Sequence, residues 1–456
     1  MASSWVNRRF SRRSLLTGSA KLGFGVGVAS TFAAFLAACG QAPAAAPAAP
    51  AAPTALPLTG KLRLLLGSHM EPVLKINELH ASRYGLTPEV ESITTPDLAN
   101  KVTTALLART APADSFFLTA GMVPSIAENN WLRPMDTFMN EKVRNGGQGT
   151  LLENGMIAAQ YQSTTWAVPW AMGAPILHWN KQLMEEFGLD PEAPAKWHST
   201  ANSWDTFVEY AVKMTGKLNG APVYGYTDAW AGSGVLFTWG SLLQMHGGRW
   251  LDDDGQPVMN SVAGIEATQK IYDLLHTHKC VDPAVTTYTW VFDASPGYLE
   301  GQRGMFITWP FIAGIANGAD SKLAGKSGYA PNPSVDTSAS VDGSEFFAVP
   351  TIAENEAEAM RWLETIVSKD AQKLVAQGGW AGIYGDVMND PEILATFPFY
   401  TAIADSYKYP VDGGYSPDRP VWTEILANQI HEVLADKKDA KTALDDAVKE
   451  IVASRK

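Results

Sequence analysis

Cysteine is nearly absent from this sequence. The 456 residues include only two cysteines, Cys39 and Cys280. Two such residues give no disulfide framework, and no cysteine pair is spaced to bind zinc. The metalloprotease motif H-E-x-x-H is missing as well. We therefore expect neither a metal nor a cofactor, and we expect Cys280 to be a small buried hydrophobic residue.

Positive charge is also scarce. The formal net charge is −12 at pH 7, and residues 1–38 contain five arginines and lysines but no acidic residue. The remainder of the chain is therefore more acidic than the whole. Such a surface repels nucleic acid and anionic lipid, so we expect no nucleic-acid partner. The hydrophobic content of 46% and charged content of 18% are typical of a globular protein.

Motifs typical of enzymes are incomplete. Residues 325–327 (GKS) match the end of a phosphate-binding loop, but Asp320 stands where the first glycine is needed. Residues 232–234 (GSG) lack the glycine spacing of a nucleophile elbow. A glycosidase needs only two carboxylates, and carboxylates are plentiful, so that class stays open. No residue can be named as catalytic.

The N-terminal segment has the layout of an export signal. Arg12 and Arg13 precede a weakly apolar run from Leu22 to Ala38, as in twin-arginine signals. We interpret residues 1–38 as a lipoprotein signal peptide. A plain signal peptide and a membrane span remain alternatives, although a span needs about 20 uninterrupted apolar residues and glycines interrupt this run.

A lipid anchor is the next expectation. Residues 36–40 (LAACG) resemble a lipobox, in which the thiol of the cysteine, here Cys39, takes a diacylglyceryl group. Residues 39–57 are dominated by alanine and proline, which favours an extended, semi-rigid spacer without a core. We therefore interpret 39–57 as a lipidated tether.

From residue 58 the sequence alternates between strand-like and helix-like segments. The expected elements are, in order, a strand at 61–67, a helix at 70–82, a strand near Val90, a helix from Pro96 and a strand at 114–118. This alternation predicts a parallel sheet covered by helices. Ligands of such sheets lie beyond the carboxyl ends of the strands, so Ser68 and the loop at 119–121 are expected to face a cleft. We expect His69 to be a surface histidine rather than a ligand contact.

The rest of the chain is organised around the stretch Tyr161–Gln182. Two apolar extended runs meet there through Pro169, Trp170 and Gly173. Proline and glycine at such a junction propagate neither a sheet nor a helix. We interpret the stretch as a crossover between two lobes.

This stretch and four later blocks resemble the family 1 extracellular solute-binding proteins, which are the carbohydrate-type receptors of ABC importers. The later blocks occur in family order, at 203–207 (SWDTF), 247–252 (GGRWLD), 301–310 (GQRGMFITWP) and 347–350 (FAVP). The similarity spans roughly residues 60–435. Two departures stand out: residues 307–309 read ITW where the family often has GPW, and small residues follow Trp170 where many relatives place a polar group.

The resemblance implies an α/β fold of the type II periplasmic-binding-protein class. Its two lobes would each contain a helix-flanked, mainly parallel sheet, and the chain would cross between them three times. We expect lobe one to comprise 58–168 and 344–392, and lobe two to comprise 169–343 and 393–456. Such a fold closes around its ligand by hinge motion.

Tryptophans are the candidate ligand contacts. An indole offers a flat apolar face to the C–H face of a pyranose, while polar groups take the hydroxyls. Matching to the family places three of them near the cleft, namely Trp170, Trp309 and Trp380. Weaker candidates are Trp230, Trp290 and Trp422, while Trp197, Trp204 and Trp362 suit core or helix packing. Gly379 lies in a glycine loop that leaves backbone amides accessible.

The expected function is that of a receptor rather than an enzyme. By resemblance, it is a monomeric, lipid-anchored receptor at the extracytoplasmic face of the membrane, which binds an oligosaccharide and delivers it to an ABC permease. One alternative is an exported carbohydrate-active enzyme with two cleft carboxylates. Another is the same receptor fold with a glycerophosphodiester or polyamine as ligand, for which Arg419 is the available phosphate-binding residue.

Overall fold

The computed structural model describes residues 58–318 and 321–455, which belong to one compact unit of the chain. The predicted signal peptide, Cys39 and the tether lie outside these residues. Among the described helices, none is both long and apolar enough to cross a membrane. The described residues also contain no cluster of three or more side chains that could hold a metal ion.

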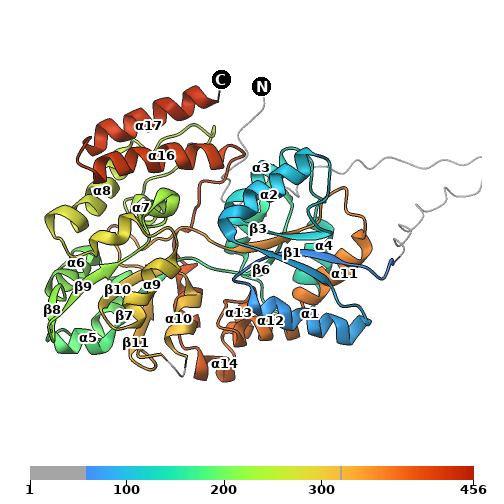
Figure 1. Cartoon of the computed structure of the whole chain (residues 1–456), viewed down its shortest axis with the longest axis horizontal. Coiled ribbons are helices and arrows are strands. Elements are labelled where there is room, and N and C mark those ends of the chain that lie inside the picture. Colours follow the sequence, from blue (N-terminus) through green and yellow to red (C-terminus); the bar gives the residue numbers. More distant parts are fainter. Residues whose placement is uncertain (1–57, 319–320, 456) are drawn as a thin grey trace, which may run out of the picture. The chain divides into compact units, whose positions relative to one another are not determined.

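Lobe one is built on a five-stranded sheet with the order β2-β1-β3-β12-β6 (Figure 1). Its strands are β1 (Arg63–Gly67), β2 (Glu89–Ile93), β3 (Ser115–Thr119), β6 (Val168–Ala171) and β12 (Glu345–Ala348). β1 pairs in parallel with β2 and β3, whereas β12 runs antiparallel to β3 and β6. Right-handed crossovers place α1 (Glu71–Tyr84) and α2 (Thr95–Leu107) on opposite faces of this sheet.

The remaining helices of lobe one come from two distant parts of the chain. They are α3 (Val123–Ala127), α4 (Asp136–Phe138), α11 (Glu356–Ile366), α12 (Lys369–Gln377), α13 (Gly385–Met388) and α14 (Pro391–Thr396). The helix α15 (Tyr400–Ser406) contacts α13 of lobe one and β7 and β11 of lobe two. A two-stranded sheet of β4 (Gln160–Tyr161) and β5 (Thr164–Thr165) adds a small antiparallel ribbon. Because helices cover both faces of the main sheet, Leu64 to Leu66 of β1 are fully buried.

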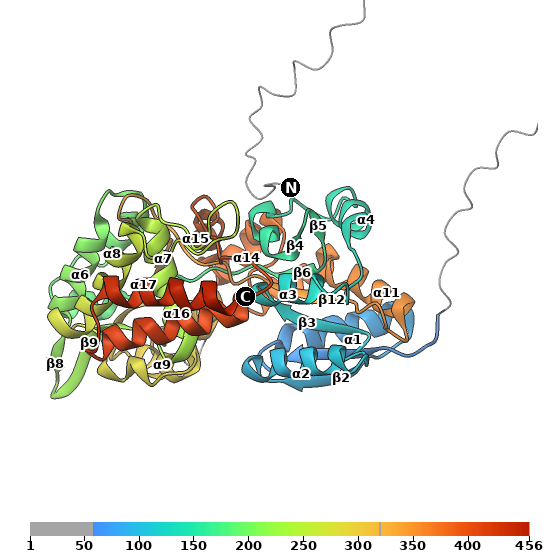
Figure 2. The ribbon, with the colours of Figure 1, turned by 90° about the horizontal axis from the view of Figure 1, so that it is seen from above.

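Lobe two has its own five-stranded sheet, in the order β11-β7-β10-β9-β8. Its strands are β7 (Ile176–Asn180), β8 (Gly216–Leu218), β9 (Ala221–Thr227), β10 (Arg303–Thr308) and β11 (Ser327–Ala330). Its helices are α5 (Lys181–Glu186), α6 (Ser203–Lys213), α7 (Val235–Met245), α8 (Val262–Tyr272), α9 (Val291–Leu299), α10 (Pro310–Ala316), α16 (Arg419–Leu434) and α17 (Ala440–Ser454). Figure 2 shows α16 and α17 lying side by side, and Cys280 is buried in this lobe's core, as expected.

The two-lobed α/β fold is confirmed, but the description of both sheets as mainly parallel is wrong. In lobe one, two strand pairs are parallel and two are antiparallel. Among the described strands of lobe two, β9 and β10 form the one parallel pair, while β7 runs antiparallel to β10 and β11. The β8–β9 pair is a hairpin closed by Asn219 and Gly220, both with positive φ, and a two-residue turn requires antiparallel strands. The direction of a strand depends on how it is connected to its neighbours, and the periodicity of its residues does not predict this.

Three crossovers connect the lobes: 172–175 joins β6 to β7, 331–344 joins β11 to β12, and the third leads from the lobe-one helices to α16. Backbone hydrogen bonds tie them together: Gly343 N donates to Gly173 O over 2.6 Å, and Asp342 N donates to Val411 O over 3.0 Å. The third changeover is predicted at residue 393, and α15, which follows it, contacts both lobes. The hydroxyl of Tyr400 donates to the carbonyl of Trp380 in lobe one, while the helix also contacts β7 and β11 of lobe two.

Candidate functional site

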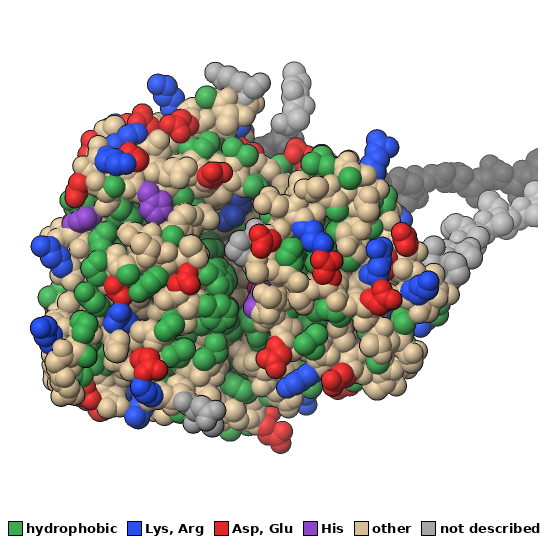
Figure 3. Space-filling view, in the orientation of Figure 1, with side chains coloured by type: hydrophobic (Ala, Val, Ile, Leu, Met, Phe, Trp, Pro, Cys, Tyr) green, Lys and Arg blue, Asp and Glu red, His purple; other side chains and the backbone are tan. Residues whose placement is uncertain are grey.

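A cavity of about 260 Å³ lies between the two lobes. Lobe one contributes Thr119 at the end of β3, the next two residues Ala120 and Gly121, and Ala171 at the end of β6. Lobe two contributes Trp309, which follows β10 directly. The cavity therefore lies at strand ends, where α/β folds bind their ligands. Figure 3 shows a hollow down the middle of this face, with hydrophobic side chains gathered along it.

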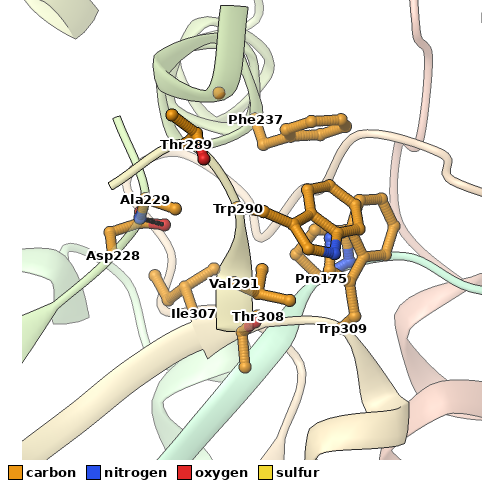
Figure 4. A pocket seen from close by; sticks show the side chains of 11 residues that line it. Pro175, Asp228, Ala229, Phe237, Thr289, Trp290, Val291, Ile307, Thr308 and Trp309 are labelled. Atoms are coloured by element: carbon orange, nitrogen blue, oxygen red, sulfur yellow. Dashed lines mark hydrogen bonds between the residues drawn. The ribbon is translucent and has the colours of Figure 1, made fainter. Parts of the chain in front are cut away.

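One wall of this inter-lobe cavity is aromatic. The rings of Phe237 and Trp309 are 5.0 Å apart with an interplanar angle of 77°, and those of Trp290 and Trp309 are 6.3 Å apart at 36°. Figure 4 shows these three side chains together at one side of a small void of about 20 Å³ inside lobe two. Trp290 is fixed by the cap of α9, because the Asp293 carboxylate accepts hydrogen bonds from the backbone N–H groups of Thr289 and Trp290.

Arg419 is the cation of the cavity lining. It is the first residue of α16, and its Nε donates to the carbonyl of Gly413 over 2.8 Å. Its two terminal nitrogens have no hydrogen-bond partner within 58–318 and 321–455. Gly121 leaves the space for this group, since a Cβ there would lie 2.3 Å from Nη1 of Arg419. The site therefore offers unused donors.

Glu345 is an acceptor in the same lining. Its Oε1 lies 2.9 Å from Nε2 of His69, while its Oε2 is buried and has no hydrogen-bond partner in the described part of the chain. Burial lowers the pKa of His69, but the charge and hydrogen bond of Glu345 outweigh this, so the pKa is raised. The His69 side chain is only 10% exposed. The expectation of a surface histidine is therefore wrong, because the loop after β1 packs beneath Trp380, 5.4 Å away.

Asp342 is the second carboxylate of the lining, and it is held within the crossovers. Its Oδ1 accepts from the backbone and hydroxyl of Ser344 over 2.9 and 2.6 Å, and its Oδ2 accepts from the hydroxyl of Tyr415 over 3.0 Å. Burial raises the pKa of Asp342 to about 6, although these hydrogen bonds favour the charged form. Asp342 therefore ties the second crossover to the third and is less available to a ligand than Glu345.

The structure brings together only some of the predicted tryptophans. Trp309, Trp290 and Trp380 line the cavity. Trp170 is fully buried behind Trp380, with ring centroids 5.4 Å apart, so the expected exposure of its face is not found. An aromatic residue at a strand end can point to either side of the sheet, and β6 turns this one inward.

Trp230 and Trp422 are also corrected. Both are fully buried in the core of lobe two, outside the cavity lining. The indole N–H of Trp230 donates to the buried Asp228 over 2.9 Å, and that of Trp422 donates to Ser416 over 2.8 Å. A tryptophan whose N–H finds an internal partner suits a core as well as a cleft.

The two non-aromatic candidates lie beside the cavity. Ser68 is exposed and lines a neighbouring hollow. Gly379 is buried at a φ of 84° and packs against the backbone of Gly314, with the Cα of each within 3.2 Å of a Cβ built on the other. Neither residue lines the inter-lobe cavity itself.

Sequence reasoning missed Glu345, Asp342 and the aromatic residues Phe237 and Phe311. A signal for Glu345 exists in the strand direction: β12 runs antiparallel to β3, which puts its first residue, Glu345, opposite Thr119 at the end of β3. The start of an antiparallel strand therefore shares the ligand-binding edge with the ends of its parallel neighbours. Finding this residue required knowing that β12 is antiparallel.

Two α/β lobes with a ligand-sized cleft between them are the architecture of solute-binding proteins. A model of the family described as bacterial extracellular solute-binding protein matches residues 75–373. Because the match covers more than half of the chain, the protein belongs to this family, as the sequence blocks predicted.

Individual relatives are more distant. A Sinorhizobium fredii protein named as an amino-acid ABC transporter periplasmic-binding protein is 27% identical over 269 residues, which is 58% of this chain and 56% of that protein. The match thus spans about half the length of this relative. A Thermotoga lettingae solute-binding protein bound with alpha-D-tagatose has a TM-score of 0.76 at 23% identity, over 86% of this chain and 98% of that one. Maltose-bound MalE3 of T. maritima has a TM-score of 0.74 at 23% identity, with the same coverage. At such identities the likeness of structures shows the fold.

Proposed function

We propose that this protein is the receptor of an ABC importer and that it binds a carbohydrate, specifically an oligosaccharide, in the inter-lobe cavity. It then delivers the sugar to the permease subunits in the membrane. One arrangement carries the proposal: aromatic faces at Trp309 and Trp290 lie in the same cavity lining as the terminal nitrogens of Arg419, which have no acceptor, and a carboxylate oxygen of Glu345, which has no donor.

This arrangement suits a pyranose. The C–H face of the sugar stacks on an indole, while its hydroxyls both donate and accept at the ring edge. Oε2 of Glu345 can only accept a hydrogen bond, and the terminal nitrogens of Arg419 can only donate. A hydroxyl is the neutral group that satisfies both. Each buried group left unpaired in the free protein gains a partner when the sugar binds.

The balance of charge favours a neutral ligand over the alternatives. A phosphodiester would meet Arg419 favourably, but it would also face Glu345 and Asp342. A polyamine would suit the two carboxylates and the aromatic wall, but it would be repelled by Arg419. An amino acid, which carries both charges, is the competing small ligand, because one guanidinium and two carboxylates line the same cavity.

Asp342 and Glu345 are the two carboxylates that an enzyme of the glycosidase type would use in this cavity. The pKa of Asp342, raised to about 6 by burial, lies in the range of a general acid, and Glu345 would be its partner. Against this, both oxygens of Asp342 already accept hydrogen bonds from Ser344 and Tyr415. These hydrogen bonds hold the carboxylate in place, so neither of its oxygens is free to exchange a proton with a substrate.

A ligand screen on the purified protein tests the proposal. Thermal shift is measured with panels of sugars, polyols, amino acids, spermidine and glycerophosphodiesters, because a ligand that binds only the folded state raises Tm. We expect stabilisation by carbohydrates alone, with the sugars recovered unaltered by chromatography. Released reducing ends would support the enzyme instead, and stabilisation by amino acids alone would refute a carbohydrate receptor.

The cellular setting follows from the N-terminal sequence. We expect export by the twin-arginine route, lipidation at Cys39 and a monomeric receptor held at the extracytoplasmic face of the membrane. Metabolic labelling with a fatty acid should mark the full chain and not the Cys39→Ser variant. Light scattering on the detergent-solubilised protein should give the mass of one chain.

A further inference from the structure

A second, larger hollow of about 510 Å³ adjoins the inter-lobe cavity. Among the described residues, Phe311 and Trp380 are the two that line both spaces. Their rings are stacked with centroids 4.7 Å apart and an interplanar angle of 24°. Phe311 lies on α10 of lobe two and Trp380 follows α12 of lobe one. The stacked pair is therefore the partition between an inner cavity and an outer one.

The lobe-two wall of the outer cavity is apolar and accessible. Phe292 is 46% exposed and Ile315 is 44% exposed, although both are large hydrophobic residues. The ring of Phe292 lies 5.6 Å from that of Phe311, with an interplanar angle of 43°. Phe292 is the exposed ring of this pair, while the ring of Phe311 also stacks on Trp380. Exposed apolar surface beside a binding cleft marks a contact site.

The lobe-one wall of the outer cavity is polar. Ser68, Glu71 and Lys75 line it, and all three are exposed. In the described part of the chain, their side chains take part in no hydrogen bond or ion pair. The outer cavity thus presents an aromatic face opposite free donors and acceptors. The inner cavity likewise combines an aromatic wall with polar groups, but different residues supply them.

We propose that the outer cavity is a second sugar subsite, which binds the distal units of the oligosaccharide whose end occupies the inner cavity. Phe292 and Phe311 form its stacking platform, and Ser68, Glu71 and Lys75 bind the outward hydroxyls. The inference rests on the proposed carbohydrate receptor and adds where a longer chain lies. A ligand that reaches both cavities passes the Phe311–Trp380 partition, so these rings exchange their mutual contact for contacts with the sugar.

Chain length provides the test. Affinities are measured by calorimetry for malto-, cello-, manno-, xylo- and arabino-oligosaccharides of one to five units. In the series that binds, affinity should rise at the length that first reaches the outer cavity. Phe292→Ala should remove that rise, a loss of roughly 3- to 10-fold for the longer chains, and leave the shorter ones unchanged.

A matched control separates the subsite from general damage. Leu107 on α2 is 66% exposed and lines neither cavity, so Leu107→Ala should leave every affinity unchanged. Affinity that is independent of chain length overturns the subsite, as does an equal loss at all lengths in Phe292→Ala or no loss at any length. In each of these cases binding of the short sugar still supports the receptor. Failure of every carbohydrate to bind would instead refute the proposed function and the subsite with it.

Discussion

The indole ring of Trp309 lies directly against the backbone of Gly343. A Cβ built at Gly343 would come within 1.8 Å of Cζ3 and 2.1 Å of Cη2 of that ring. Gly343 belongs to the second crossover, and Trp309 is the aromatic residue at the end of β10 that faces the cavity. Because Gly343 has no side chain, the indole of Trp309, a candidate sugar-stacking face, can pack directly against the crossover that joins the lobes.

Replacing this glycine should damage the site. In Gly343→Ala the new methyl group overlaps the ring, and the backbone beside it is tied to Gly173 O, so Trp309 must move. We expect the affinity for the carbohydrate ligand to fall by about 10-fold or more, since a contact displaced by an ångström loses its geometry. Calorimetry on the folded variant measures this loss.

Gly173→Ala is the matched control on the neighbouring crossover. Its Cβ would meet only ordinary contacts, at 3.8 Å from Gly343 O and 4.0 Å from Trp309 Cε3, and neither glycine has a positive φ. We expect near wild-type affinity. If the two variants bind equally well, the ring of Trp309 does not depend on the crossover as described.

The aromatic wall makes a second prediction. Trp309→Ala and Trp290→Ala should each weaken carbohydrate binding by at least about 3-fold, because each removes one stacking face. The fold should survive in both variants. Trp290 is partly exposed, whereas Trp309 is only 8% exposed, so Trp309→Ala should also lower Tm. Tryptophan fluorescence titration and calorimetry give the affinities, and circular dichroism checks the fold.

Trp230 serves as the control for the two cavity tryptophans, because its replacement should affect stability rather than binding. It is fully buried and donates to Asp228, so Trp230→Phe should lower Tm without a selective change in affinity. An unchanged affinity in both cavity variants would remove Trp309 and Trp290 from the binding site. A selective loss of affinity in Trp230→Phe would show that burial is a poor guide here.

The fold could be predicted from sequence because its signals are local and ordered along the chain. Alternating strands and helices at 61–118, the crossover at Tyr161–Gln182 and the later blocks together predicted two lobes and three crossovers. The antiparallel strands of lobe two were missed because β7 reaches its sheet from a crossover rather than from a helix. A strand sequence carries no mark of its direction.

The site residues were harder to predict than the fold, because residue type does not determine which way a side chain points. Trp170 and Trp309 both stand at strand ends, yet one is buried behind Trp380 and the other lines the cavity. The polar half of the site depends on pairs brought together from far along the chain. His69 and Glu345 are 276 positions apart, and only the antiparallel register of β12 joins them.

The His69–Glu345 pair makes a third prediction, on pH. The pKa of His69 is raised above its ordinary value of 6.5 in the folded protein. The stability that this ion pair contributes is therefore fully present below pH 6.5 and is lost as the pH rises through the raised pKa. Carbohydrate affinity should fall over the same range, because neutral His69 no longer holds Glu345 in place.

Thermal denaturation and calorimetry between pH 6 and pH 9 measure both effects. Glu345→Gln should abolish the pH dependence in this range and lower the affinity throughout, since the amide accepts a hydrogen bond more weakly than the carboxylate. His69→Gln should keep much of the affinity at high pH while losing the pH dependence. A pH profile that is identical in wild type and Glu345→Gln would contradict this role.

The fourth prediction concerns His178, in the middle of β7, which should make the folding stability depend on pH in the acidic range. It is fully buried between Tyr298 and Tyr329, with ring centroids 6.3 and 5.0 Å away, and burial lowers its pKa to about 3. In the unfolded chain its pKa is near 6.5, so the folded state binds the proton less tightly. Stability is therefore fully present above pH 6.5 and is lost as the pH falls towards 3, by about 2 kcal/mol at pH 5.

Comparing variants isolates this contribution from others in the same range. Burial lowers the pKa of His80 to about 4, which acts in the same sense, whereas the raised pKa of Asp342 acts in the opposite sense between about 4 and 6. The measured quantity is the change in unfolding free energy from pH 7 to pH 5, in wild type and in His178→Leu. We expect the variant to lose less stability on acidification by about 2 kcal/mol, whatever its stability at pH 7. Equal losses in the two proteins would mean that His178 has the same pKa in the folded and unfolded states, which contradicts the effect of its apolar surroundings.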